Sequence, residues 1–262
     1  MMSDGKQLDY DEEPAGQQQR SQAQRQGALD DGSELPVKEG AVFGVIGVLI
    51  TYLTHLYLTV AASAQAAPIT YADGDTTVVT DLVSSWVAAG WSYLAAFGVG
   101  FEASGEVATL SAAPNNVAAL SNTPFALATT VLFTVTVGSL MVAGYGVARY
   151  TDADSPVDAV KAGLTIVPPY LVFAAIAAFL MTHSYGDEVL VGQIIDNVGT
   201  LEGGQFLNDE GDVISNVDFG ASTTDAILFA GIIFPTAFAI VGSLITQGEA
   251  VIDTAVAKIN DR

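Results

Sequence analysis

The sequence predicts an all-α integral membrane protein with four transmembrane helices, one aromatic helix on the extracytoplasmic membrane surface, and a small acidic outer loop containing a β-hairpin. Two observations lead to this fold class. Half of the 262 residues are hydrophobic and only 14% are charged, a composition too apolar for an ordinary soluble domain. The eight Lys and Arg residues fall into three groups separated by long stretches without a basic residue, as in multi-pass proteins.

The charge balance is strongly acidic and limits the possible partners. There are 29 acidic and 8 basic residues, which gives a formal net charge of −21. Such a chain repels phosphates, so we expect no binding of nucleic acid. In molar salt the Debye length falls to about 3 Å, and we therefore interpret the acidity as a halophilic adaptation.

Cysteine is absent and histidine occurs only twice. This excludes disulfides, thiolate metal sites and a cysteine nucleophile, and it leaves few ligands for zinc. We expect no metal site and no cofactor.

The N-terminal part consists of a polar tail and a first span. Residues 1–39 are polar and rich in Gln, with too few large apolar side chains to offset the entropy of ordering, so we expect a disordered cytoplasmic tail. Residues 40–62 carry no formal charge and reach about 33 Å as a helix, enough to cross a bilayer. The small residues at 62–66 resemble a signal-peptide cleavage site, but the region before them is unusually long and acidic. We interpret 40–62 as an uncleaved anchor, with a cleaved signal peptide as the alternative.

The next segment, 80–101, contains both tryptophans of the chain, Trp86 and Trp91, together with Tyr93. Its apolar residues recur at helical spacing opposite a group of serines, and Trp and Tyr suit the membrane interface. If this segment crossed the bilayer, the basic residues of the second group would lie outside, against the preference of Lys and Arg for the cytoplasm. We predict an interfacial helix on the extracytoplasmic face, with a tilted fifth span as the alternative.

Three more segments are long and apolar enough to cross the bilayer, at 125–147, 162–182 and 226–246. Four spans place all three basic groups on one side, so both termini are predicted to be cytoplasmic. Residues 40–247 thus form a membrane domain in the cell membrane. Residues 248–262 continue at helical spacing as an amphipathic cytoplasmic stub.

The outer loop at 183–225 carries nine acidic residues. Its stretch QFLNDEGDVIS at 205–215 predicts a β-hairpin, and the apolar spacing within 187–198 predicts a short helix. The acidic residues lack the spacing of an EF-hand. We interpret them as solvated surface instead of a specific calcium site.

Proline residues mark two of the spans. Pro168 and Pro169 precede Tyr170 in the third span, and Pro235 lies in the fourth. Because proline lacks the backbone donor and collides with the carbonyl four residues earlier, both helices should kink. Interrupted helices of this kind can form transporter binding sites, or the kinks can be structural only.

His55 is an ionisable residue about 15 positions into the first span, with Thr51 and Thr59 four residues away on either side. An ionisable residue inside a membrane is a functional candidate by default. We expect Tyr57, Tyr145 or His183, which ends the third span on the same side, as its partner. The ring is either a neutral, hydrogen-bonded imidazole or part of a proton relay. None of the four predicted spans contains Asp or Glu, which argues against an ion-coupled pump.

Several motifs resemble those of a known family. They are the Trp-rich segment, VAGYGVARY at 142–150, KAG and VPPYLV in the third span, and AGIIFPTAFAIVGS at 230–243. Over roughly residues 38–247 the chain resembles a family of uncharacterised small multi-pass membrane proteins of halophilic archaea. The resemblance implies the same architecture and no particular activity.

The expected function follows from two features of the sequence: small residues that favour helix packing are abundant, and known catalytic motifs are not found. Glycine and alanine fill the spans, which allows close helix packing in a monomer or a homo-oligomer. No nucleophile elbow, phosphate-binding loop or HExxH motif is present, so we expect no enzyme. We expect an accessory or structural membrane component in the lipid bilayer, associated with a membrane-protein partner or a second copy. The alternative is a small transporter or channel with a path beside the kinked third and fourth spans and His55.

Overall fold

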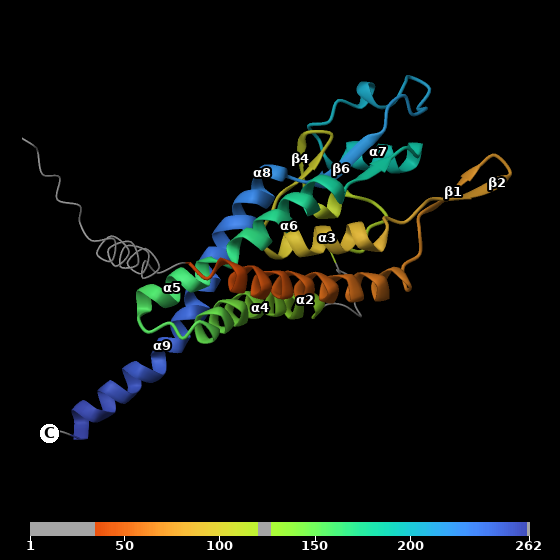
Figure 1. Cartoon of the computed structure of the whole chain (residues 1–262). Coiled ribbons are helices and arrows are strands. Elements are labelled where there is room, and N and C mark those ends of the chain that lie inside the picture. Colours follow the sequence, from red (N-terminus) through yellow and green to blue (C-terminus); the bar gives the residue numbers. More distant parts are fainter. Residues whose placement is uncertain (1–34, 120–126, 261–262) are drawn as a thin grey trace, which may run out of the picture. The chain divides into compact units, whose positions relative to one another are not determined.

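Four helical segments account for the membrane part of the fold. A computed structural model describes residues 35–119 and 127–260, so the predicted disordered tail lies outside the described residues except for 35–39. Within this part, four helical segments are long and apolar enough to cross a membrane. They are α2 (Val37–Ser63), α4 (Ala128–Tyr150), the pair α5 and α6 (Pro156–Leu164 and Val167–Leu180), and the segment Thr223–Gly248, which lies mostly in α9 (Phe234–Asn260) (Figure 1).

Small and polar residues face the interior of this bundle, whereas large aliphatic residues face outward. On α2 the buried stripe includes Gly44, Thr51 and His55, while Val42 and Leu53 are more than half exposed. Soluble proteins rarely expose an aliphatic surface of this extent to water. The distribution is that of a multi-pass membrane protein.

Glycine contacts bring the long helices together and fix their relative directions. Gly40 packs against Thr165 and Gly44 against Pro169, so α2 runs parallel to the pair α5 and α6. Gly144 packs against Ala239, and Thr246 and Gln247 lie beside Arg149 and Asp152 near the C-terminal end of α4, so α4 and α9 run parallel. Gly40 and Gly44 form a GxxxG pair that packs against another helix of the same chain. A side chain at either position would collide with Thr165 or Pro169.

The third span is broken before its prolines and begins earlier than predicted. Helix α5 starts at Pro156, where the Asp158 backbone N–H donates to the Ser155 hydroxyl at 3.2 Å, a typical N-cap. A turn at Thr165 and Ile166 separates α5 from α6. The prolines then occupy the first turn of α6, where the missing backbone donor costs nothing. The predicted kink is a helix break, and the span begins at 156 instead of 162.

Pro235 is accommodated in a different way. It lies in the first turn of α9, directly after an eight-residue π-helix, η4 (Ala226–Ile233), which follows the single turn α8 (Thr223–Asp225). The wide π-helical turns change the alignment of the carbonyls that precede the proline ring. The sequence predicted a kink here but did not predict a π-helix.

The aromatic helix α3 (Ser85–Ala96) is shorter and more buried than the predicted segment at 80–101. Its 12 residues span about 18 Å, too short to cross a bilayer. It lies alongside α2 in the opposite direction, with Ser85 near Ser63 and Ser92 near His55 (Figure 1). Helix α3 therefore begins at the end of the bundle where α2 stops.

Two antiparallel sheets lie at this same end. Strands β1 (Thr70–Asp73) and β2 (Thr76–Val79) form a hairpin. The second sheet has the order β4-β3-β6-β5, with β3 at Phe101–Ala103, β4 at Glu106–Ala108, β5 at His183–Tyr185 and β6 at Val217–Ala221. Strand β6 pairs with both β3 and β5, and so it joins the segment after α3 to the segment after α6.

The fold is thus mostly helical with small sheets instead of all-α. The predicted hairpin at 205–215 is reduced to a single bridge between Leu207 and Val213 around a turn at Gly211. The predicted short helix of the outer loop is confirmed as α7 (Glu188–Asn197), which Asp187 caps by accepting from the Val189 and Leu190 backbone N–H groups. Short 3-10 turns, η1 (Leu110–Ala112) and η3 (Gly203–Gln205), complete this region.

Candidate functional site

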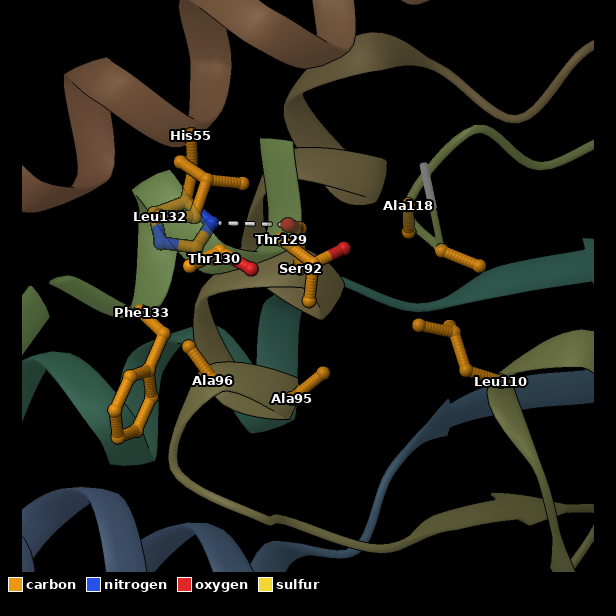
Figure 2. Close-up of a pocket in the computed structure, with 11 residues that line it drawn as sticks. His55, Ser92, Ala95, Ala96, Leu110, Ala118, Thr129, Thr130, Leu132 and Phe133 are labelled. Carbon is orange, nitrogen blue, oxygen red and sulfur yellow. Dashed lines mark hydrogen bonds between the residues drawn. The ribbon is translucent and has the colours of Figure 1, made fainter. Parts of the chain in front are cut away.

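His55 joins three helices through its two ring nitrogens. Its side chain is fully buried. The Nδ1 atom lies 2.9 Å from the Ser92 hydroxyl of α3, and Nε2 lies 3.3 Å from the Thr136 hydroxyl of α4. The dashed line in Figure 2 marks the bond to Ser92. Because a hydroxyl can donate or accept, either neutral tautomer of the ring is satisfied here.

The predicted partners of His55 are wrong. Tyr57 is 73% exposed on the outer face of α2, and His183 packs its ring against Tyr185 in strand β5, at 4.5 Å between ring centroids. Tyr145 makes no hydrogen bond with His55 either, because both ring nitrogens are bound to hydroxyls. The residues that do bind the imidazole, Ser92 and Thr136, were missed because they lie 37 and 81 positions along the chain.

A cavity of about 510 Å³ opens beside His55 and Ser92. We call it the His55 pocket. Small residues of α3, together with two threonines and two apolar residues of α4, form most of its wall (Figure 2), and none of the described residues that line it is charged. The lining consists of His55, Ser92, Ala95, Ala96, Leu110, Ala118, Ala119, Thr129, Thr130, Leu132 and Phe133.

A family model of unknown function (DUF7978) matches residues 17–250. The chain belongs to this family. The match includes all four long helices, α3 and every residue of the His55 pocket. It agrees with the expected resemblance to an uncharacterised family, while the halophilic archaeal origin stays a prediction. Searches of curated proteins and of solved structures gave no match.

Two buried tyrosines lie in the helical core of this DUF7978 member. The Tyr93 ring packs edge-on against His55 and Phe173, at centroid distances of 5.9 and 5.0 Å. Tyr170 of α6 places its hydroxyl against Gly47 of α2. Neither tyrosine hydroxyl has a hydrogen-bond partner among the described residues. Tyr170, predicted as part of a kink, is therefore a core residue between α2 and α6.

The tryptophans of α3 have different environments, and only one of them is on the surface as predicted. Trp86 is 47% exposed. Trp91 is fully buried, donates from Nε1 to the Met181 carbonyl at 2.7 Å, and packs against Phe219 of the sheet. The buried Tyr93 also corrects the prediction, since its ring lies inside the protein instead of at the lipid surface. Trp91 joins α3 to the end of α6 and to the sheet.

The remaining predicted residues lie outside the pocket of the DUF7978 member. Pro169 packs on Gly44, and Pro168 is exposed at the start of α6. Pro235 is buried at the start of α9. Burial lowers the pKa of His183, and the nearby Asp81 carboxylate partly opposes this shift. In the part of the chain that the structure describes, no cluster of three His, Asp or Glu side chains is arranged to hold a metal ion.

Proposed function

We propose that this DUF7978 member is a non-enzymatic accessory membrane protein that binds a small, mainly apolar molecule in the His55 pocket. The observation that carries the proposal is the pocket itself. Its volume of about 510 Å³ lies in the range typical of ligand sites, which are mostly apolar with a few polar groups that fix orientation.

The lining supports an apolar ligand that arrives through the lipid. Residues Thr129, Thr130 and Phe133 line the pocket and are also exposed on α4. A molecule dissolved in the bilayer could therefore reach the pocket from the side of this helix. Once inside, it would contact mainly apolar walls, the exposed Thr129 and Thr130, and one buried polar point at His55 and Ser92.

The surroundings of His55 support binding more than catalysis. A general base needs a free nitrogen within reach of the substrate, but both nitrogens of His55 are engaged by hydroxyls. No described lining residue is acidic. The proposal accordingly requires no metal and no cofactor, and it assigns no catalytic residue.

We further propose the cell membrane as the location, with both termini in the cytoplasm and the pocket in the extracytoplasmic half. Lys38 lies at the start of α2, and Arg149 and Lys161 flank the connection from α4 to α5. The alternating directions of the four segments bring these residues to one end of the bundle, which agrees with the preference of basic residues for the cytoplasmic side. The lipid bilayer is then the main partner, joined by a membrane-protein partner or a second copy, and the net charge of −21 supports the absence of nucleic acid from this proposal.

A transporter remains the second candidate because two spans are interrupted, at Thr165 and at η4. Interrupted helices expose carbonyls that can bind a substrate. Against this, Gly44 and Gly47 pack closely on Pro169 and Tyr170, which fills the space between α2 and α6 at this level of the bundle. Flux of a solute into proteoliposomes that is lost in a His55→Ala plus Pro235→Ala variant would favour transport over binding.

Photolabelling tests the binding proposal. The full chain in lipid nanodiscs is irradiated with a long-chain alcohol that carries an aliphatic diazirine, and the labelled residues are mapped by mass spectrometry. We expect saturable labelling at Ala95, Ala96, Thr130 or Phe133. An Ala96→Phe variant should lose it because the ring fills the pocket, whereas Ala237→Phe, at an exposed position of α9, should keep it. Labelling confined to the outer faces of α2 and α9, without saturation, would refute the proposal.

A further inference from the structure

We propose that the His55 pocket selects a ligand with a neutral oxygen-bearing group, a ketone, ester or alcohol, on an apolar body. Ser92 would hold this oxygen, and the row Thr136, His55, Ser92 would set whether the Ser92 hydroxyl donates or accepts. This inference rests on the proposed binding function and adds the chemical class of the ligand.

The first step is that Ser92 is the polar contact. Ser92 lines the pocket, is only 6% exposed, and makes its one side-chain hydrogen bond in the described part of the chain with His55. A hydroxyl has one hydrogen and two lone pairs, so this bond leaves capacity for a second partner. That capacity is available to a polar atom of a ligand, because a hydroxyl can make more than one hydrogen bond.

The second step is that His55 controls the direction of the Ser92 hydrogen. When Nδ1 carries the proton, it donates to Ser92, and Thr136 donates to Nε2. The Ser92 hydrogen is then free for a carbonyl oxygen of the ligand. When Nε2 carries the proton, it donates to Thr136, and Ser92 donates to Nδ1 and offers only lone pairs, which suit the hydroxyl hydrogen of an alcohol. His55 is therefore a positioning residue that acts through Ser92.

The third step excludes charged ligands. No described residue of the lining is charged, so a carboxylate or ammonium group at Ser92 would lose its hydration without gaining a counter-ion. Such burial costs several kcal/mol. A pure hydrocarbon would fit the walls but would leave the Ser92 hydroxyl without its second partner.

Competition against the photolabel tests the class of ligand. Four unlabelled molecules of equal chain length are compared: a 2-ketone, a primary alcohol, the alkane and the carboxylate. We expect the ketone and the alcohol to displace the label, the alkane to do so about 2- to 10-fold more weakly, the value of one hydrogen bond, and the carboxylate not to compete. In Ser92→Ala this preference should vanish while labelling persists, whereas Ser85→Ala, whose hydroxyl bonds Ser63 outside the pocket, should behave as wild type.

The positioning role of His55 has a spectroscopic signature. The chain has only two histidines, so in a His183→Gln variant with ¹⁵N-labelled histidine the only imidazole signals come from His55. Saturation with the ketone should shift its tautomer toward protonated Nδ1. Thr136→Val should remove this response and Thr136→Ser restore it, although Thr136 does not line the pocket.

The outcomes separate the two proposals. If the photolabel never saturates pocket residues, the binding function itself fails. If the photolabel saturates pocket residues but the alkane competes as well as the ketone, and Ser92→Ala does not change this competition, the binding function is retained and the proposed ligand class is overturned. An unchanged His55 tautomer on ketone binding overturns the role of His55.

Discussion

At the scale of single residues, close contacts decide which side chains the bundle accepts. Gly47 on α2 faces the hydroxyl of Tyr170, and a β-carbon at this position would collide with that oxygen. The ring carbon that bears the hydroxyl lies 3.4 Å from the same point, an ordinary contact. The hydroxyl oxygen therefore restricts which residues position 47 can accept.

Gly47→Ala should therefore destabilise the protein by about 1–3 kcal/mol through overpacking. Tyr170→Phe alone should be close to neutral, and the double variant should recover most of the loss because the colliding oxygen is gone. Thermal unfolding in detergent measures all three. Gly138→Ala on α4, where an added β-carbon meets no neighbouring atom, is the matched control and should be neutral or stabilising. An additive double variant would contradict the assigned contact.

His183 gives the protein a pH-dependent stability. Burial lowers its pKa in the folded protein from 6.5, so the unfolded chain takes up the proton first as the pH falls. Above about pH 6.5 the protonation of His183 has no effect on the free energy of unfolding. Below this pH the free energy of unfolding falls progressively, until the folded imidazole is also protonated. Unfolding midpoints measured between pH 7.5 and pH 5 should fall less in His183→Gln than in the wild type. An identical pH slope in both proteins would refute this role.

At the scale of elements, α3 shows what sequence could and could not predict. The apolar spacing of residues 80–101 predicted a helix, and the distribution of basic residues predicted that this helix does not cross the membrane. The structure has a short helix there, α3, which runs back along α2. Its burial was not predictable, because aromatic residues suit a lipid interface and a protein core equally well. The hydroxyl partners of His55 were missed for a related reason: isolated Ser and Thr residues are common in apolar helices, and only the packing of three helices brings these two together.

Length and composition predicted the four spans, since a run of apolar residues needs no tertiary contact to be recognised. The sheet could not be predicted in the same way. Strands β3 and β5 have three residues each, too few to show a two-residue period. Their pairing depends on β6, more than 30 positions further along the chain than either.

Trp91 links α3 to the sheet, and its replacement should lower the free energy of unfolding. Trp91→Phe removes the bond from Nε1 to the Met181 carbonyl and leaves a buried acceptor without its partner, so we expect a destabilisation of about 1–3 kcal/mol. Trp86→Phe removes a side chain that is 47% exposed and should change stability by much less. Chemical denaturation in mild detergent compares the two variants. Equal losses would mean that the bond to Met181 contributes little.

At the scale of the whole molecule, the absence of cysteine allows the topology to be tested with single labels. Val107→Cys and Ile214→Cys lie at exposed positions near the sheets, and Asp154→Cys lies in the connection between α4 and α5. An impermeant thiol reagent applied to intact cells should label the first two and not the third. Labelling of Asp154→Cys from outside would invert the proposed orientation.

The short length of α3 has a consequence for where the protein meets its ligand. A helix of about 18 Å reaches only part of the way through a hydrocarbon core of about 30 Å. In the proposed orientation, the His55 pocket, one wall of which is α3, would then lie in a single leaflet. A molecule confined to the other leaflet would have to flip across the bilayer before it could bind, so the occupancy of the pocket would report the composition of one side of the membrane only.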